Sequence, residues 1–368
     1  MGLQDRVLAW TETVRGAGAP AAAMRAFALA TLGPLLLWLA GLALGGAMAW
    51  AALVVIGAGV WLLDRFAAGA APHVPGAAEF PAADGLSVLL AGLHLAVLPL
   101  AVWALAGGLA LTLAEGLALF WGLGLWIGQV SNANAHELIH RQDRWLRALG
   151  VAVYASVGYG HHASAHRHVH HRFVATWDDP NTARRGEGFW EFLARAWPGE
   201  FAAGYRMESA LRARLPAGRR RGVHAYAVYL AGAVLAAALA LVLGGLAGVA
   251  IWLGLAVWVQ VQHLLSDYVQ HYGLERARLP DGRPEPVGPR HSWDSAHWAS
   301  SALMLNASRH ADHHAHPGRP YPALDLPPGG LRLPCSLPVM AVLALVPPLW
   351  FRVMDRRLPP PAPAFARM

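Results

Sequence analysis

Charged residues are scarce in this 368-residue chain, where they make up 14% of the sequence against 56% for hydrophobic residues. A soluble domain carries about 25% charged residues, so this composition leaves too little polar side-chain surface for a water-soluble globule of this size. Lysine is absent, and all 29 basic residues are arginine. The single cysteine, Cys335, excludes a disulfide framework and a multi-cysteine metal site within one chain. The composition therefore predicts an integral membrane protein.

Long apolar runs are abundant, and six of them are candidates for crossing a bilayer. A transmembrane helix needs about 20 mostly apolar residues. The runs lie at 27–44, 48–63, 86–105, 109–130, 223–243 and 246–269. They form three pairs, and the members of each pair are separated by a glycine-rich turn near residue 45, 107 or 246. We expect an all-α polytopic protein in which three helical hairpins and the polar segments make a single domain, residues 1–368.

The bulk polar sequence falls in two segments, 131–222 and 270–368. The hairpin turns are too short to hold a domain, so both segments should share one side of the membrane with the two termini. Arginine is concentrated on that side, and arginine-rich loops face the cytoplasm. We predict a multi-pass protein of the inner (cytoplasmic) membrane with its polar segments and termini inside. The apolar stretch Val339–Phe351 contains Pro347 and Pro348 and should pack on the cytoplasmic side instead of crossing the membrane.

Nineteen histidines are present, and many stand at helical spacing. The string "HELIH" places two histidines four residues apart, and "RHADHH" places three at positions i, i+3 and i+4. Residues three and four apart lie on one face of a helix, so such imidazoles can approach one metal ion. Nine candidate ligands occur in four stretches: His136, His140, His166, His170, His171, His271, His310, His313 and His314. Three or four ligands fill one ion, so nine indicate two metals, and all-nitrogen sites suit iron, zinc, copper or nickel.

Several other polar residues could support these ligands from outside. His168 should point away from the face that its neighbours share. His263 precedes His271 by two helical turns and is a candidate partner of a ligand. Asp178 and Asp179 follow the second histidine stretch at a turn, and one of them could hold the free N–H of a ligand histidine.

The "HELIH" string by itself also matches the zinc metalloprotease pattern, in which the glutamate, here Glu137, acts as the base. A protease would leave most of the nine histidines unexplained. A metal transporter should carry ionisable residues along its spans, and too few are present here for a metal path. Glu137, and Asp312 in the last motif, are instead further candidates for partners of the ligand histidines.

Five stretches after residue 130 form an ordered series. They are "NAHELIHR" (134–141), "HHRFVATWDDPNTARRGEGFW" (170–190), "DYVQHYGL" (267–274), "RHADHHAHP" (309–317) and "PPLWFRVMD" (347–355). Together they resemble the integral-membrane alkane monooxygenases (alkane omega-hydroxylases) of the membrane fatty acid desaturase-like superfamily. The six-span layout agrees with that family, whereas the first 130 residues match it only in hydrophobicity.

The resemblance implies a non-haem di-iron centre, with the nine histidines as ligands and no catalytic residue beyond the metal centre. Such a centre activates O2 to hydroxylate the terminal methyl of a medium- or long-chain alkane. Electrons would come from a rubredoxin-type carrier and its reductase. The other expected partners are the bilayer and a hydrophobic small molecule, with no nucleic acid. A fatty-acyl desaturase or hydroxylase and an alkylbenzene monooxygenase remain alternatives.

Two positions depart from the family pattern. The family has glutamate before the first histidine of the second stretch, where this chain has Ala165, and "EHYGL" where this chain has "QHYGL" with Gln270. Both changes remove a carboxylate near the expected metals, and such carboxylates raise the basicity of ligand histidines. We expect altered redox tuning or a different substrate.

Overall fold

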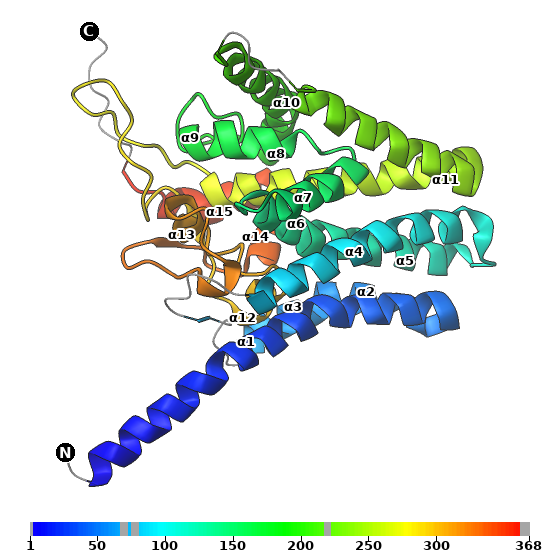
Figure 1. Cartoon of the computed structure of the whole chain (residues 1–368), viewed down its shortest axis with the longest axis horizontal. Helices are drawn as coiled ribbons and strands as arrows, with labels where there is room; N and C mark the ends of the chain where they lie inside the picture. Colours follow the sequence, from blue (N-terminus) through cyan, green and yellow to red (C-terminus); the bar gives the residue numbers. More distant parts are fainter. Residues whose placement is uncertain (1–2, 67–72, 75–80, 217–221, 361–368) are drawn as a thin grey trace.

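The computed structural model describes residues 3–66, 73–74, 81–216 and 222–360, with side chains in the first helix described from Pro20, and it is built almost wholly of helices (Figure 1). The helices are α1 (Leu3–Leu44), α2 (Ala51–Val54), α3 (Val60–Phe66), α4 (Pro81–Trp103), α5 (Leu113–Trp126), α6 (Asn132–Ile139), α7 (Arg144–Ser156), α8 (His162–Ala165), α9 (His171–Phe173), α10 (Phe189–Ala213), α11 (Ala225–His271), α12 (Trp298–Leu303), α13 (His310–Ala315), α14 (Leu337–Ala344) and α15 (Pro347–Met354). Two short strands, β1 (Trp293–Asp294) and β2 (Leu331–Arg332), pair in parallel.

In the described part of the chain, five helical segments are long and apolar enough to cross a membrane: Pro20–Leu44, Gly46–Phe66, Pro81–Gly108, Leu113–Ile139 and Ala225–His271. The last has 47 residues and would be about 70 Å long as one rod, more than twice the hydrocarbon core. Its backbone is not helical at Gly244 and Gly245, and Gly248 packs directly against the backbone of Ala240. The segment is therefore a hairpin of two spans (Figure 1), and the layout agrees with the six predicted runs.

The three hairpins turn where the glycine pattern predicts. Gly45, Gly107 and Gly245 have φ values of 63°, 104° and 58°. Residues with a Cβ rarely adopt this region, so glycine is the residue that lets a tight turn form there. The fourth span differs from its predicted end at residue 130, because the helix continues through a π-helical turn at Ile127–Ser131 into α6. No glycine or proline interrupts "NANAHELI", so nothing stops the helix before His140.

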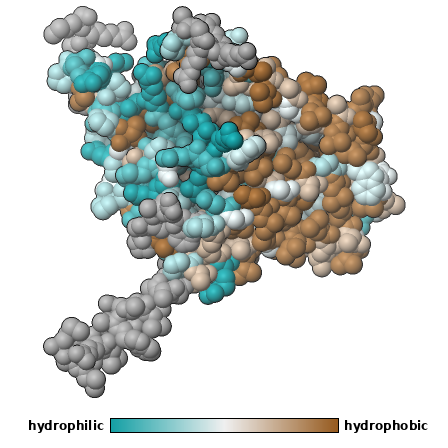
Figure 2. All heavy atoms as spheres, in the orientation of Figure 1, coloured by the Kyte–Doolittle hydropathy of each residue, from teal (hydrophilic) through white to brown (hydrophobic). Residues whose placement is uncertain are grey.

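Polarity divides the molecule along its length (Figure 2). Hydrophobic residues cover the region of the hairpins, where large apolar side chains such as Val242 and Leu246 are more than 80% exposed. Hydrophilic residues cover the opposite end. Exposed apolar surface of this extent marks a lipid-facing region in a helical bundle.

The polar end has its own small core. α14 and α15 pack against the polar-side end of α11, where Trp350 contacts the rings of Tyr268 and Tyr272. Each of these two helices has eight residues and is about 12 Å long, too short to cross a bilayer. This agrees with the expectation that Val339–Phe351 packs on the protein instead of spanning the membrane.

Candidate metal centre

The four histidine motifs meet at the polar end of the bundle. His136 lies on α6 and His140 directly follows that helix. The second motif lies on α8, a π-helical turn at His166–His170, and α9. His271 is the last residue of α11, and the fourth motif forms α13. Segments more than 170 residues apart in sequence therefore meet at one place.

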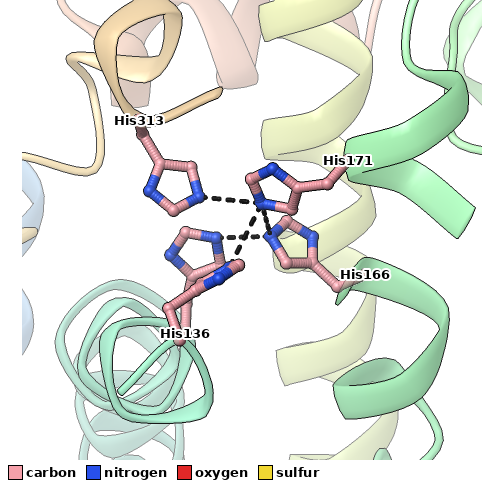
Figure 3. Close-up of side chains that lie close together, drawn as sticks. His136, His166, His171 and His313 are labelled. Atoms are coloured by element: carbon pink, nitrogen blue, oxygen red, sulfur yellow. Dashed lines mark hydrogen bonds between the residues drawn. The ribbon is translucent and has the colours of Figure 1, made fainter. Parts of the chain in front are cut away.

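Five histidines form the first group, which we call the five-histidine group: His136, His140, His166, His171 and His313. One ring nitrogen of each lies within 4.8 Å of those of all the others. The Nε2 atoms of His136 and His166 are 2.7 Å apart, and those of His171 and His313 are 3.1 Å apart. Figure 3 shows the four labelled rings, which come from three of the motifs, pointing toward one another.

The remaining four candidates form the four-histidine group: His170, His271, His310 and His314. Nε2 of His310 lies 3.0 Å from Nε2 of His271 and 3.0 Å from Nε2 of His314. All four side chains are buried. All nine sequence candidates are thus brought together, in two neighbouring groups.

The division between the groups differs from the α-helical expectation. His166 and His170, which would share a face of an α-helix, belong to different groups, and His166 instead meets His171 at 2.9 Å. The π-helical turn explains this, because its wider repeat brings residue i beside residue i+5. His168 belongs to neither group, and its ring lies 3.9 Å from the Glu208 carboxylate. The spacing predicted the residues but not their grouping.

The two groups fit transition-metal ions by distance and by donor type. With metal–nitrogen bonds of about 2.1 Å, adjacent ligands of an octahedral ion lie about 3.0 Å apart, close to the spacing seen here. Burial and the neighbouring imidazoles hold the pKa values of His140, His171 and His313 well below 6.5. These rings are therefore neutral, which is the form that binds metal. In the described structure the buried Nε2 of His170 has no hydrogen-bond partner, so this nitrogen can bind an ion once its proton is displaced.

Asp179 supports the four-histidine group directly. Nδ1 of His170 donates to its carboxylate over 2.8 Å, which leaves Nε2 free, and Thr182 donates to the same carboxylate. Burial alone would lower the pKa of His170, but the charge and hydrogen bond of Asp179 raise it to about 9. Asp178 is exposed and does not take part in this contact. Nδ1 of His271 is held by the carbonyl oxygen of His291 at 3.2 Å.

The comparisons with known proteins give the family. The fatty acid desaturase family model matches residues 110–326. Alkane 1-monooxygenase of Pseudomonas putida is 35% identical over 282 residues, which cover 74% of this chain and 67% of that protein. The enzyme of the same name from Ectopseudomonas oleovorans is 36% identical and covers 74% and 68%. Alkane 1-monooxygenase 1 of Alcanivorax borkumensis is 36% identical and covers 74% and 67%.

The chain belongs to the alkane monooxygenase family. It is a membrane member of the fatty acid desaturase group, and the matched region includes all nine histidines. Both spans of the first hairpin and the first span of the second hairpin lie before that region. The matched region therefore contains the whole candidate metal centre of this alkane monooxygenase-like chain.

Two other acids proposed as partners of ligands have different contacts. Glu137 forms an ion pair with Arg141 at 2.8 Å and accepts the backbone N–H of Tyr321 at 3.1 Å. Asp312 forms an ion pair with Arg319 and accepts from Nδ1 of His316. Both acids brace the chain segments that carry the motifs. The position of Glu137 also argues against its use as the base of a zinc protease, because an arginine neutralises it.

The side chain of His162 separates His263 from the five-histidine group. The ring centroid of His263 is 4.0 Å from that of His162, which in turn lies 4.9 Å from His166. Sequence reasoning missed His162 as a support. Its Nδ1 contacts Glu200 at 2.6 Å, and Tyr159 donates to the other oxygen of that carboxylate. Glu200 lies on α10, far along the chain, so spacing within the motif could not reveal the contact.

Asp294 is a second support that sequence reasoning missed. Its carboxylate accepts the backbone N–H of Ala311 at 2.9 Å and pairs with Arg332. It thereby fixes the first turn of α13, which carries the last three histidines. Asp294 stands outside every motif, and only the pairing of β1 with β2 brings Arg332 to it.

The two departures from the family pattern have identifiable surroundings. Ala165 is buried against Gly204 of α10, which approaches it without a side chain between them. The Gln270 amide donates to the carbonyl of Ala307 at 3.1 Å and its oxygen accepts from Ser266. Gln270 thus connects the end of α11 to the segment before α13 without adding charge.

A cavity of about 500 Å³ connects the apolar side to the histidines. His136, His166 and His310 line its inner end. Its walls are largely apolar, and two lining side chains are well exposed: Trp61, in the second apolar span, at 45% and Val342, on α14, at 67%. The cavity therefore lies between the bilayer-facing surface and both histidine groups, and its size suits a small apolar ligand.

Proposed function

We propose that this protein is an O2-dependent monooxygenase that hydroxylates the terminal methyl of a medium- or long-chain alkane at a histidine-ligated di-iron centre. The observation that carries the proposal is the apolar cavity that ends at the two histidine groups. The named relatives support the substrate class. The five-histidine group would hold one iron and the four-histidine group the other.

An unactivated C–H bond resists acids, bases and nucleophiles, so its oxidation needs a metal-bound oxidant, and two irons bound here would supply it from O2. The protein's own side chains supply position and dryness. The apolar walls admit a hydrocarbon from the membrane side and keep bulk water out. The side chains of His136, His166 and His310 face the bound chain end. Asp179 holds His170 in one orientation and accepts its N–H.

We propose that the protein lies in the inner membrane with its histidine groups on the cytoplasmic side. The support for this orientation is the arginine-rich polar end of the molecule, since arginine-rich loops stay on the cytoplasmic side. A cytoplasmic site suits an electron donor that is a soluble carrier.

Oxidation of a substrate panel by whole cells tests the activity. Cells that express the chain should convert linear alkanes to 1-alkanols, with less product from alkylbenzenes and fatty acids. Cells that express a His171→Ala variant are the control. Alkylbenzene or fatty-acid oxidation without alkane oxidation would assign the protein to one of the alternative activities, and no O2-dependent product would refute the proposal.

We also propose that a rubredoxin-type carrier docks beside the second motif. Arg184 and Arg185 are exposed there, and the Arg184 guanidinium lies 4.5 Å from the ring centre of the exposed Trp177. Thr182, two residues before Arg184, donates to Asp179, which holds His170. A short path therefore joins this basic surface to the four-histidine group. Charge complementarity mainly speeds encounter, and salt screens it.

Charge reversal tests the docking site. An Arg184→Glu/Arg185→Glu variant should slow reduction by the carrier and reduce its salt dependence, while metal content and reduction by a chemical reductant stay unchanged. The matched control is Arg206→Glu/Arg214→Glu, at two exposed arginines elsewhere on the polar end. Normal carrier-driven turnover with unchanged salt dependence in the first variant would place docking elsewhere.

A further inference from the structure

A second cavity, of about 650 Å³, lies between α4, α7 and the first arm of α11. It shares no lining residue with the cavity at the histidines. Its walls are apolar, with Leu95 and Val102 on α4, Val151 on α7, and Leu235 and Leu239 on α11. The last two are 71% and 44% exposed on the hydrophobic surface. The cavity is therefore a groove that opens toward the lipid.

Three arginines line the same groove: Arg144 and Arg147 on α7, and Arg167 in the π-helical turn. Arg167 is half-buried. Among the described residues, none of the three has a carboxylate within 4.0 Å. The groove thus combines an apolar wall with an excess of positive charge.

The acidic groups nearby accept other hydrogen bonds. Glu208 lines the groove but accepts a hydrogen bond from Ser164 at 2.5 Å. The carboxylate of Asp143 caps α7 by accepting the backbone N–H groups of Trp145 and Leu146. One carboxylate and three guanidinium groups in the lining leave a net positive charge of two.

The length of the groove matches a lipid in one leaflet. Along α11 its lining runs from Ala225 to Ala240, about 22 Å at 1.5 Å per residue. One leaflet of the hydrocarbon core is about 15 Å thick, so acyl chains can lie along the apolar wall while a headgroup stays at the polar end. Ala225 is the first residue of α11, next to the polar end of the molecule where the histidine motifs lie. The ligand that fits both halves is an anionic amphiphile.

We propose that this groove binds an anionic membrane phospholipid, with its phosphate between Arg144, Arg147 and Arg167 and its acyl chains against α4 and α11. A bound phosphate would join α7, which follows the first histidine motif, to the turn that carries His166 and His170. The lipid would thereby hold two metal-carrying segments together. The inference rests on the groove and its charges and does not depend on which substrate the enzyme oxidises.

Native mass spectrometry of the full-length protein after delipidation in detergent tests the site. We expect the parent to retain one phosphatidylglycerol, and to prefer it to phosphatidylcholine with the same acyl chains. An arginine near a membrane surface contributes enough that each Arg→Gln change should weaken phosphatidylglycerol retention about fivefold. The variants are Arg144→Gln and Arg144→Gln/Arg167→Gln. The single variant lies outside the histidine motifs and keeps the test informative if the double variant does not fold.

Two controls separate the charge from the groove. Arg206→Gln/Arg290→Gln removes the same charge from exposed positions outside the groove and should change retention less than twofold. Ala152→Trp fills the groove at an exposed lining position without changing charge and should also weaken retention. Three results would each refute a phospholipid site. The first is equal retention of the two lipids, and the second is unchanged retention in Arg144→Gln and in Ala152→Trp. The third is protection against thermal unfolding by inorganic phosphate alone that equals the protection by phosphatidylglycerol.

Discussion

The two histidine groups lie side by side but are supported differently. In the four-histidine group, outer ring nitrogens are held by Asp179 and by the carbonyl of His291. In the five-histidine group, no carboxylate contacts any of the five rings within the described structure, and two of its members, His136 and His166, border the cavity, against one member of the four-histidine group, His310. The four-histidine group is oriented by contacts from outside the group, whereas the five-histidine group depends on its larger number of candidate ligands. The two metal positions should therefore differ in metal affinity, in pH response and in closeness to substrate.

Loss of one histidine of the five-histidine group should have the largest effect on metal content and turnover. His140→Ala, His171→Ala and His313→Ala each remove a ligand of the five-histidine group. We expect metal loss and a fall in turnover of more than about 100-fold, since removal of a ligand's partner alone costs about 10–100-fold. Elemental analysis and single-substrate assays of purified protein measure both.

The matched controls lie within the same motifs but outside both groups. His168→Ala and His316→Ala should keep the metal content and most of the activity, because His168 points to Glu208 and His316 to Asp312. Full metal content with normal turnover in His313→Ala would show that the ligand assignment is wrong.

Asp179→Asn should weaken the four-histidine group selectively. The amide cannot supply the negative charge that orients His170, so metal affinity of this group should fall about 10–100-fold while the five-histidine group is unaffected. Asp178→Asn is the control, because that side chain is exposed. Metal titration against a competing chelator measures the two affinities. If Asp179→Asn and Asp178→Asn bind metal with equal affinity, Asp179 does not strengthen metal binding.

The two groups should also respond differently to pH. The pKa of His170 is raised to about 9, so its metal-free imidazole is protonated at pH 7, and metal must displace that proton. Affinity of the four-histidine group should rise up to about tenfold per pH unit between pH 7 and about 9. The pKa values of His140, His166, His171 and His313 lie well below 6.5, so the five-histidine group should be insensitive in this range.

The contact between Asp179 and His170 also makes the stability of the metal-free protein depend on pH. Because its pKa is higher in the folded state, His170 stabilises the metal-free protein fully below pH 6.5, and this contribution is lost as pH rises through about 9. Calorimetric titrations in buffers of different ionisation enthalpy measure the proton released on metal binding. The same metal affinity at pH 7 and pH 9 in His313→Ala, which leaves the four-histidine group intact, would contradict this explanation.

The cavity offers the smallest and most specific change. Gly57 lines it, and a Cβ there would meet no atom within 4 Å, so a side chain can be added at this position, and we expect Gly57→Phe to narrow the path. We expect a shift of about tenfold in preference toward shorter alkanes, with little change in the turnover of the shortest substrate. Gly92→Phe, at an exposed position of α4 outside the cavity, is the control. An unchanged chain-length profile in Gly57→Phe would mean that the substrate takes another route.

The comparison also shows how far sequence reasoning reaches. Apolar run length and glycine turns predicted six spans, because both depend on local chemistry. The nine histidines could be selected as candidate ligands because their motifs are local too, and the structure brings all nine together. Their division into groups was not, since a π-helical turn sends His166 and His170 to different sides. Supports such as Glu200 and Asp294 were missed because they come from distant elements that only tertiary packing brings close.

Mössbauer spectroscopy of purified protein loaded with isotopically enriched iron tests the central claim most directly. The account predicts two iron environments of equal area, because five and four imidazoles with different outer contacts cannot give identical sites. Asp179→Asn should change one of the two signals and leave the other. A single iron environment in the parent, or protein that retains no iron under conditions where it is active, would contradict a centre with two unequal histidine-ligated irons.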